Sequence, residues 1–361
     1  MSIIIALIIF SAIVLFHELG HFLLAKRGGI GVVEFSLGMG PRLLSHEWGG
    51  TVYSLKLLPF GGSCLMVGED PEEKYSKDVW PVKQSREIPG AYDEHSFQMA
   101  SVWTRIAVVA AGPAFNFILA WVLALIIVGS VGYDNTKVDI IPDSAAAEAG
   151  MEDGDQIISI NGSRTFLYRE VSLYSSLHQG QTATVVYERN GEKQTVVLTP
   201  KQSDTGAYLY GFSRTVQREK GGALETVGYS CAEIRYWLKA TVESLKMLIG
   251  GQVGLEEMSG PVGIVSTIGD TYKESRVDGW YYVTMNMIMI AILLSVNLGV
   301  MNLLPIPALD GGRLVFLILE AIRGKAIPAE KESMVHFTGF VLLMGLMAVI
   351  LFSDLHKLFI K

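Results

Sequence analysis

Four long apolar blocks restrict the folds open to this sequence. Each is close to the roughly 20 apolar residues that a helix needs to cross a bilayer, and they occupy residues 2–25, 106–131, 280–304 and 337–352. Only 18% of the 361 residues are charged, compared with about 25% in an average soluble domain. The first block has no basic residue before it and no small-x-small cleavage site after it, so we interpret it as a retained helix rather than a signal peptide. We therefore expect a multi-pass α-helical membrane protein with four transmembrane helices.

The orientation of these helices follows from the positions of basic residues in short loops, which tend to stay in the cytoplasm. Lys26 and Arg27 follow the first block. Between the third and fourth blocks lie Arg313, Arg323, Lys325 and Lys331. Both segments are expected on the cytoplasmic side, which places the two termini and residues 132–279 outside.

Charge and cysteine content exclude several other classes of protein. The formal net charge is −7 and no run is rich in lysine or arginine, so nucleic acid is not expected as a partner. The two cysteines, Cys64 and Cys231, are far apart in the sequence. They form neither a disulfide framework nor a cysteine zinc site.

A small β-sheet is predicted between the first two apolar blocks. Residues 51–57 alternate polar and apolar side chains, as a half-buried strand does, and Gly61-Gly62 indicates a turn or bulge. Because the segment lies between two membrane helices, we expect this sheet to dip into the membrane. Residues 69–95 are polar with three prolines and predict an irregular cytoplasmic loop.

Residues 137–200 predict a compact α+β domain on the outer side. We expect helices at 145–149 and 169–178, a strand at 156–160, and a hairpin of strands 182–188 and 193–199 around Asn190-Gly191. The run from Ala149 to Gly162 resembles a PDZ domain of the bacterial protease type; another small α+β module is the alternative. Residues 223–250 have apolar side chains at helical spacing. That helix could lie on the membrane surface or pack against the PDZ-like domain.

The motif His17-Glu18-Leu19-Gly20-His21 is the strongest chemical signal. Helical residues four apart share a face, so the two imidazoles can bind one zinc ion while Glu18 holds a water molecule as general base. Ionisable groups inside a bilayer cost about 2.5–3.5 kcal/mol each on insertion scales. Their position at the end of a membrane helix is therefore rarely accidental, although a solvated helix end is the alternative.

Asp310 is the expected third zinc ligand, because a catalytic zinc site usually has three protein ligands. The other histidines lie in ordinary contexts: His46, His95, His178, His336 and His356. Pro305 and Pro307 should break the third helix, and irregular backbone at membrane depth is tolerated only where it faces protein or a cavity. By the topology above, His21 and Asp310 both lie towards the cytoplasm. The alternative role for Asp310 is that of a capping residue at the start of a loop.

Together these motifs resemble the site-2 protease family of intramembrane zinc metalloproteases, in its bacterial RseP-like branch. The matching elements are His-Glu-x-x-His, Asn-x-x-Pro-x-Pro-x-x-Asp-Gly ending at Gly311, a Gly-Pro-x-x-Asn element at 112–116, and the segments 259–264 and 35–40. The order of helices, sheet and PDZ-like domain matches as well. One departure is that the RseP-type relative has two tandem PDZ domains, whereas this sequence has room for one.

The resemblance implies roles for individual residues. It implies zinc ligation by His17, His21 and Asp310 and general-base catalysis by Glu18. Asn302 matches a residue that holds substrate near the metal, but a helix-to-helix hydrogen bond is an equal alternative. The remaining site residues are expected to be structural: Gly112, Pro113, Asn116, Pro305 and Pro307. Of these, Asn116 is expected to pack the second helix against the first rather than to take part in chemistry.

The function implied by the resemblance is zinc-dependent cleavage, in regulated intramembrane proteolysis, of peptide bonds within or near the transmembrane segments of single-span proteins. Substrates of this family are typically anti-sigma factors and remnant signal peptides, and its members lie in the bacterial inner or plasma membrane. The PDZ domain would bind a substrate C-terminus or act as a size filter. The alternative is a catalytically inactive, PDZ-bearing membrane scaffold. A transporter is disfavoured because no paired repeats are apparent.

The expected organisation has nine segments. They are the first transmembrane helix with the zinc motif (1–25), a cytoplasm-side loop with the membrane-associated sheet (26–104), the second helix (105–132), the PDZ domain (133–204), an extracytoplasmic linker with an amphipathic helix (205–279), the third helix (280–304), a cytoplasm-side segment with the Asp-Gly motif (305–336), the fourth helix (337–353) and a tail (354–361).

Overall fold

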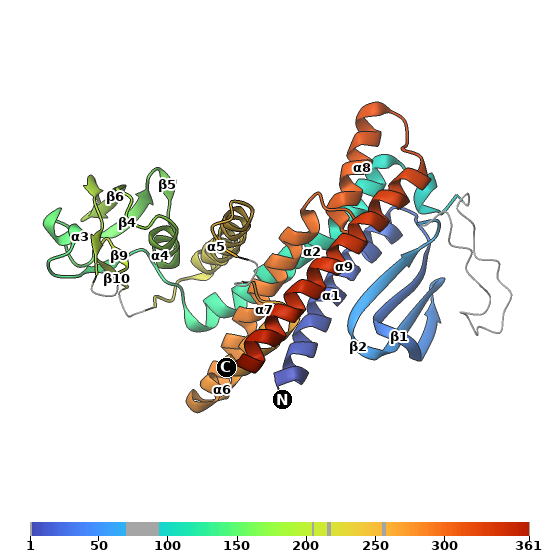
Figure 1. The fold of residues 1–361 in the computed structure, drawn as a ribbon, viewed down its shortest axis with the longest axis horizontal. Coiled ribbons are helices and arrows are strands. Elements are labelled where there is room, and N and C mark those ends of the chain that lie inside the picture. The colour runs from blue at the N-terminus through green and yellow to red at the C-terminus, as the bar shows by residue number, and fades with distance from the viewer. Residues whose placement is uncertain (1, 70–93, 204–205, 215–217, 255–257, 361) are drawn as a thin grey trace. The chain divides into compact units, whose positions relative to one another are not determined.

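A computed structural model describes residues 2–69, 94–203, 206–214, 218–254 and 258–360. The chain divides into two compact units (Figure 1). We call residues 1–120 and 245–361 the helical unit, and residues 121–244 the inserted unit. Most of the loop predicted at 69–95 lies outside the described residues.

Four helices among the described residues are long and apolar enough to cross a membrane. They are α1 (Ser2–Arg27), α2 (Val102–Val131), α7 (Trp280–Leu303) and, within α9 (Ala329–Ile360), the stretch Glu330–Lys357. They coincide with the four apolar blocks of the sequence. The last helix begins earlier than its apolar block because its first turns carry charged residues, which form helix readily but lower the hydropathy.

Two further helices of the helical unit are not evident from the sequence pattern. The first, α6 (Pro261–Asp278), packs against α1, α7 and α9. Its first turn is held by the buried Asp354 of α9, which accepts hydrogen bonds from the backbone N–H groups of Gly260 (3.2 Å) and Gly263 (2.8 Å). The second, α8 (Asp310–Arg323), ends at Gly324 in the left-handed conformation that favours glycine.

The expected β-structure is present as β1 (Val32–Trp48) and β2 (Thr51–Met66). Both strands bend, so that they pair with one another along three stretches instead of the single one of a simple hairpin. Residues 32–37 pair with 62–66 on one side and with 52–55 on the other, and residues 42–48 pair with 51–56. The two edges are therefore formed by residues 42–48 and 62–66. The sheet lies beside α1, against which β2 packs (Figure 1).

A buried carboxylate holds the bent sheet together. Glu34 lies 2.8 Å from Nε of Arg42 and 3.4 Å from Nζ of Lys56, and it accepts a hydrogen bond from Ser54. Burial favours the neutral form of Glu34, but these hydrogen bonds and the nearby positive charges outweigh it and hold its pKa below the ordinary value. Glu34 therefore stays ionised and ties the two parts of β1 and β2 to one another.

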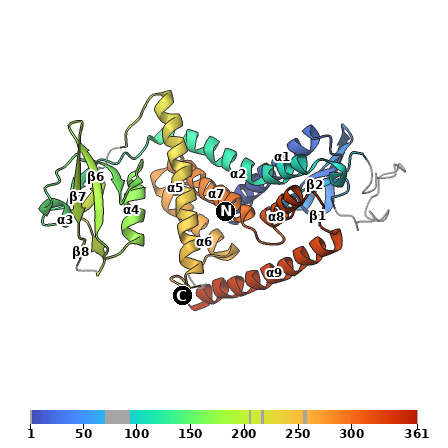
Figure 2. The same ribbon diagram turned by 90° about the horizontal axis from the view of Figure 1, so that it is seen from above.

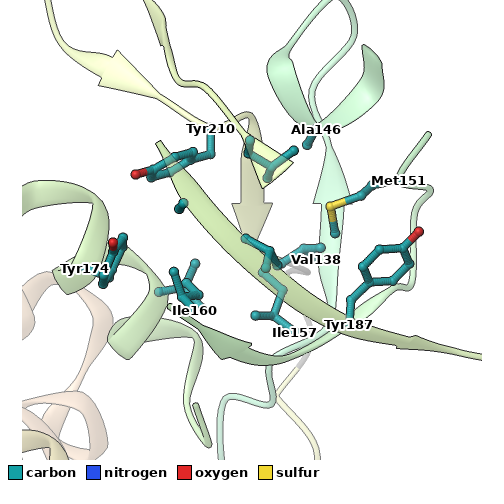
Figure 3. Packing of buried hydrophobic residues seen from close by; sticks show 12 residues of the cluster. Val138, Ala146, Met151, Ile157, Ile160, Tyr174, Tyr187 and Tyr210 are labelled. Atoms are coloured by element: carbon teal, nitrogen blue, oxygen red, sulfur yellow. The ribbon is translucent and has the colours of Figure 1, made fainter. Parts of the chain in front are cut away.

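The inserted unit contains a four-stranded antiparallel sheet in the order β5-β4-β6-β7. Its elements are β3 (Val138–Ile140), α3 (Ala145–Glu148), β4 (Gln156–Ile160), β5 (Ser163–Arg164), α4 (Tyr168–Leu177), β6 (Ala183–Arg189), β7 (Glu192–Leu198), β8 (Lys201–Gln202), β9 (Tyr208–Leu209), β10 (Phe212–Arg214) and α5 (Ala223–Ile249). Apolar side chains from the strands and from α4 form one core, including Ile157, Ile160 and Tyr174 (Figure 3). The helices, the strand and the hairpin expected between 145 and 199 all lie within a residue or two of their predicted positions.

The helix α5 packs against the rest of the inserted unit through charged side chains. Arg169 of α4 pairs with Glu233, and Arg235 lies 3.0 Å from the buried carboxylate of Glu170. Arg235 also donates a hydrogen bond to the carbonyl of Arg164 at 2.8 Å. Of the two alternatives for residues 223–250, packing against the domain is therefore observed.

Candidate metal centre

Three predicted ligand atoms meet at one point in the helical unit. Oδ2 of Asp310, the first residue of α8, lies 3.2 Å from Nε2 of His17 and 3.4 Å from Nε2 of His21. The two Nε2 atoms are 3.3 Å apart. Ligands about 2.0–2.2 Å from a tetrahedral ion lie about 3.3–3.6 Å from one another. The three atoms thus have the mutual spacing that a tetrahedral zinc ion requires.

The chemistry of this group also suits zinc. Two imidazole nitrogens and one carboxylate oxygen are a common ligand set for a catalytic zinc ion, which keeps a fourth position for water. Both histidines are buried, and within the described part of the chain the buried Oδ2 of Asp310 makes no well-directed hydrogen bond. A buried carboxylate oxygen without such a partner is costly unless a cation or proton satisfies it. His17, His21 and Asp310 therefore fit a zinc ion.

Gly20 and Gly112 allow α1 and α2 to approach closely, and Gly112 leaves room for the two imidazoles. A Cβ atom added to Gly112 would lie 2.3 Å from Nε2 of His21 and 2.8 Å from Cε1 of His17, and one added to Gly20 would lie 2.3 Å from the carbonyl oxygen of Ala111. Small residues allow membrane helices to come this close. The neighbouring Pro113 lies inside α2, which continues through it.

We expect Gly112→Ala to weaken zinc binding at least about tenfold, because a methyl group would displace both imidazoles, and loss of ligand orientation costs roughly 10–100-fold in metal affinity. Gly129→Ala is the matched control on the same helix, since its new Cβ would meet only Thr226 Cγ2, at 3.9 Å. Zinc affinity, measured by competition with a chelator, compares the two variants. Equal affinities would contradict this account of Gly112.

Each histidine has a polar partner on α2 for its other ring nitrogen. Nδ1 of His21 lies 2.9 Å from the carbonyl oxygen of Val108, so it can donate its hydrogen there and leave Nε2 free. Nδ1 of His17 lies 3.1 Å from the side-chain amide of Asn116. Partners of this kind fix the tautomer and the ring orientation of metal-binding histidines.

Asp310 is positioned by a tight turn after α7. The helix ends at Leu303, before Pro305 and Pro307, as the prolines predict. Gly311 and Gly312 allow the turn to fold back, because added Cβ atoms there would lie 2.1 and 2.4 Å from the carbonyl oxygens of Leu304 and Ile306. The first turn of α8 is therefore held directly against this loop.

Contacts of side chains outside the predicted set hold this turn and the helix α8 that follows it. His336 of α9 accepts a hydrogen bond from the backbone N–H of Ala308 at 3.0 Å, and Ala308 has an unusual positive φ of 78°. Farther along α8, Glu320 pairs with Arg105 at the start of α2 through two hydrogen bonds, one of 3.1 Å, and Figure 2 shows these helices side by side. No sequence motif marks these residues, because their roles depend on contacts between distant segments.

Glu18 and Asn302 both lie beside this group of ligands. The half-buried Glu18 lies against the 62–66 edge of the sheet, because a Cβ atom added to Gly62 would lie 3.4 Å from its Cγ. The side-chain nitrogen of Asn302 on α7 lies 3.5 Å from Nε2 of His17. The predicted site residues thus all lie at this site or on the elements that form it.

Known proteins resemble this chain over nearly its whole length. The profile of peptidase family M50 matches residues 5–346. A zinc metalloprotease RasP of Geobacillus kaustophilus is 35% identical, with 99% of each chain covered. The regulator of sigma-W protease RasP of Bacillus subtilis is 33% identical, with 98% of each chain covered. A putative zinc metalloprotease of Clostridium perfringens is also 33% identical, with the same coverage.

Among solved structures, the PDZ domain of the SdrC-like protein of Listeria monocytogenes is 21% identical, with 23% of this chain and 90% of that chain covered and a TM-score of 0.21. A score this low does not establish a shared fold. The family match, by contrast, spans both histidines and Asp310 and nearly the whole chain. The chain therefore belongs to peptidase family M50 and is a zinc metalloprotease, whose described residues include four potential membrane-spanning helices.

Proposed function

We propose that this protease hydrolyses peptide bonds within or next to the transmembrane segments of single-span proteins in a bacterial membrane. Its zinc ion would be held by His17, His21 and Asp310, and Glu18 would be the general base. The observation that carries the proposal is the 3.2, 3.3 and 3.4 Å triangle of ligand atoms, which α1 and the turn between α7 and α8 form. The relative named a regulator of sigma-W protease favours substrates of the anti-sigma-factor type, and remnant signal peptides are a second class with the same chemistry.

We assign a task to each of these side chains. A zinc ion at this point would polarise the scissile carbonyl and lower the pKa of the attacking water. Glu18 would take a proton from that water and pass it to the leaving nitrogen. We assign Asn302 to holding the substrate backbone beside His17. A hydrogen bond between α1 and α7 is the other role that its 3.5 Å distance from His17 allows.

A helical substrate must unwind before it is cut, because its carbonyl groups are already hydrogen-bonded. We propose that the unwound segment adds as a strand to the 62–66 edge of the sheet, a common way to bind extended peptides. Gly62 of this edge lies next to the side chain of Glu18. Beside the turn that carries Asp310 lies an apolar cavity of about 440 Å³ between Pro307 and α9, which is suited to apolar substrate side chains.

Leu65→Pro should reduce cleavage at least about tenfold while zinc content is unchanged, because proline removes a backbone donor and distorts the strand on which it stands. Leu44→Pro, on the opposite edge of the same sheet, is the matched control and should cleave at close to the wild-type rate. Cleavage rate and bound zinc are measured on the same preparations. Full cleavage by Leu65→Pro would rule out strand addition at this edge.

We propose that both termini and the inserted unit lie outside the cytoplasm and that the metal centre opens towards it, on the basis of the basic residues in the short loops. Cys231 on α5 is exposed, whereas Cys64 is buried. A membrane-impermeant maleimide should therefore label the wild type in intact cells but not Cys231→Ser. Labelling that requires cell lysis would reverse the orientation.

We also propose that residues 133–204 form a PDZ domain. Its elements follow the order expected from the sequence between residues 145 and 199, and the run Ala149 to Gly162 resembles a PDZ domain. The domain could bind a new substrate C-terminus or exclude substrates with a bulky outer domain. Amidating the C-terminus of a substrate separates these roles, because it removes the carboxylate without changing size.

The proposal is tested by incubating the purified protein with a single-span membrane substrate, with and without a zinc chelator. We expect cleavage within or near the transmembrane segment, its loss with the chelator, and its recovery on adding zinc. Absence of cleavage by a zinc-loaded preparation would favour the inactive scaffold.

A further inference from the structure

We propose that Asn116 is a positioning residue for zinc: its side-chain carbonyl accepts the Nδ1–H of His17 and so directs Nε2 of His17 towards the metal. This inference rests on the metal centre proposed above. It assigns Asn116 a task beyond packing α2 against α1.

The immediate surroundings of Asn116 carry the inference. The residue is fully buried, its Nδ2 lies 3.1 Å from Nδ1 of His17, and within the described residues its Oδ1 has no hydrogen-bond partner. Its backbone carbonyl accepts a hydrogen bond from Ser295 of α7 at 2.8 Å. The backbone of Asn116 is therefore fixed by α7, while its side chain faces a metal ligand.

The chemistry of imidazole decides which amide atom must face His17. A neutral histidine that binds a metal through Nε2 carries its hydrogen on Nδ1. That hydrogen needs an acceptor, and an amide NH₂ group cannot accept it. The two ends of an amide have nearly the same shape, and the hydrogen-bond network determines which end points where. In the zinc-binding form, Oδ1 of Asn116 must therefore face Nδ1 of His17.

The spacing along α2 supports this role. Val108, Gly112 and Asn116 are successively four residues apart and so lie on one face of the helix. Val108 offers its carbonyl to His21 at 2.9 Å, and Gly112 provides the space for both rings. Asn116 lies on the same face of α2, and its side chain faces His17. The two histidines are thus oriented by one helix, through a backbone acceptor for one and a side-chain acceptor for the other.

The test compares zinc affinities, by chelator competition, of the full-length protein and four variants. Asn116→Leu keeps the volume but removes the acceptor, and should lose about 10–100-fold in affinity. Asn116→Asp keeps an acceptor at the same place and should bind zinc within a few-fold of wild type. Ser295→Ala removes the hydrogen bond to the backbone carbonyl of Asn116 and should bind zinc as tightly as wild type does.

Three results would overturn the role of Asn116: Asn116→Leu binding zinc as tightly as wild type, Asn116→Asp being as weak as Asn116→Leu, or Ser295→Ala being equally weak. His17→Ala reports on the metal centre itself. If it retained full zinc affinity, the proposed centre would fail, whatever the Asn116 variants did.

Discussion

Glu18→Gln should reduce peptide cleavage by about 10²–10⁴-fold, the usual contribution of a general base, while the protein still binds zinc. Glutamine has nearly the same size as glutamate but cannot accept the proton of the attacking water. The three ligand atoms belong to other residues, so the metal should remain in place. Glu18 is half-buried and lies beside the 62–66 edge, next to the proposed substrate strand.

The measurement pairs two readouts on one preparation: the initial rate of cleavage of a single-span substrate, and the zinc-to-protein ratio. A variant with full zinc and no more than about 1% of the wild-type rate is the expected result. If the variant cleaved at the wild-type rate, another group would have to serve as the base. If it lost zinc as well, Glu18 would be helping to hold the metal, contrary to the role assigned here.

Asp310→Asn should lower zinc affinity at least about 100-fold and abolish cleavage at limiting zinc. The change removes the negative charge from one of three ligands, and even changes outside the ligand set cost roughly 10–100-fold. Asp354→Asn is the matched control: it also neutralises a buried carboxylate of the helical unit, but this one caps α6 through Gly260 and Gly263. That variant should keep its zinc.

Zinc affinity and cleavage at several zinc concentrations distinguish the two variants. Excess zinc should restore part of the activity of Asp310→Asn, since the two histidines remain. Wild-type affinity in Asp310→Asn would show that the 3.2 and 3.4 Å contacts are ordinary ion pairs with histidine, and that the third ligand lies elsewhere.

The sequence predicts best those features that depend on neighbouring residues. Hydropathy over about 20 residues identifies the four long helices, and Asn190-Gly191 identifies the hairpin of β6 and β7. The four-residue spacing of His17 and His21 places both rings on one face of α1. Pro305 and Pro307 correctly predict the end of α7. In each of these cases the chemistry of a short segment determines its conformation.

Features that depend on distant segments are not visible in the sequence. The helix α6 has few apolar residues in a row, and its first turn depends on Asp354, more than 90 positions away. The bend of β1 and β2 depends on pairing with two neighbours at once. The contacts of His336 with Ala308, and of Asn116 with His17, arise only when separate helices pack. Spacing within the sequence carries no signal for such pairs.

The central claim is that one zinc ion is shared by His17, His21 and Asp310, and X-ray absorption at the zinc edge on the purified protein tests it most directly. We predict about one zinc per chain, surrounded by nitrogen and oxygen ligands at about 2.0–2.2 Å with the scattering of two imidazoles, and loss of that signal in His17→Ala. A protein without bound zinc, a sulfur ligand near 2.3 Å, or a spectrum unchanged by His17→Ala would contradict the account.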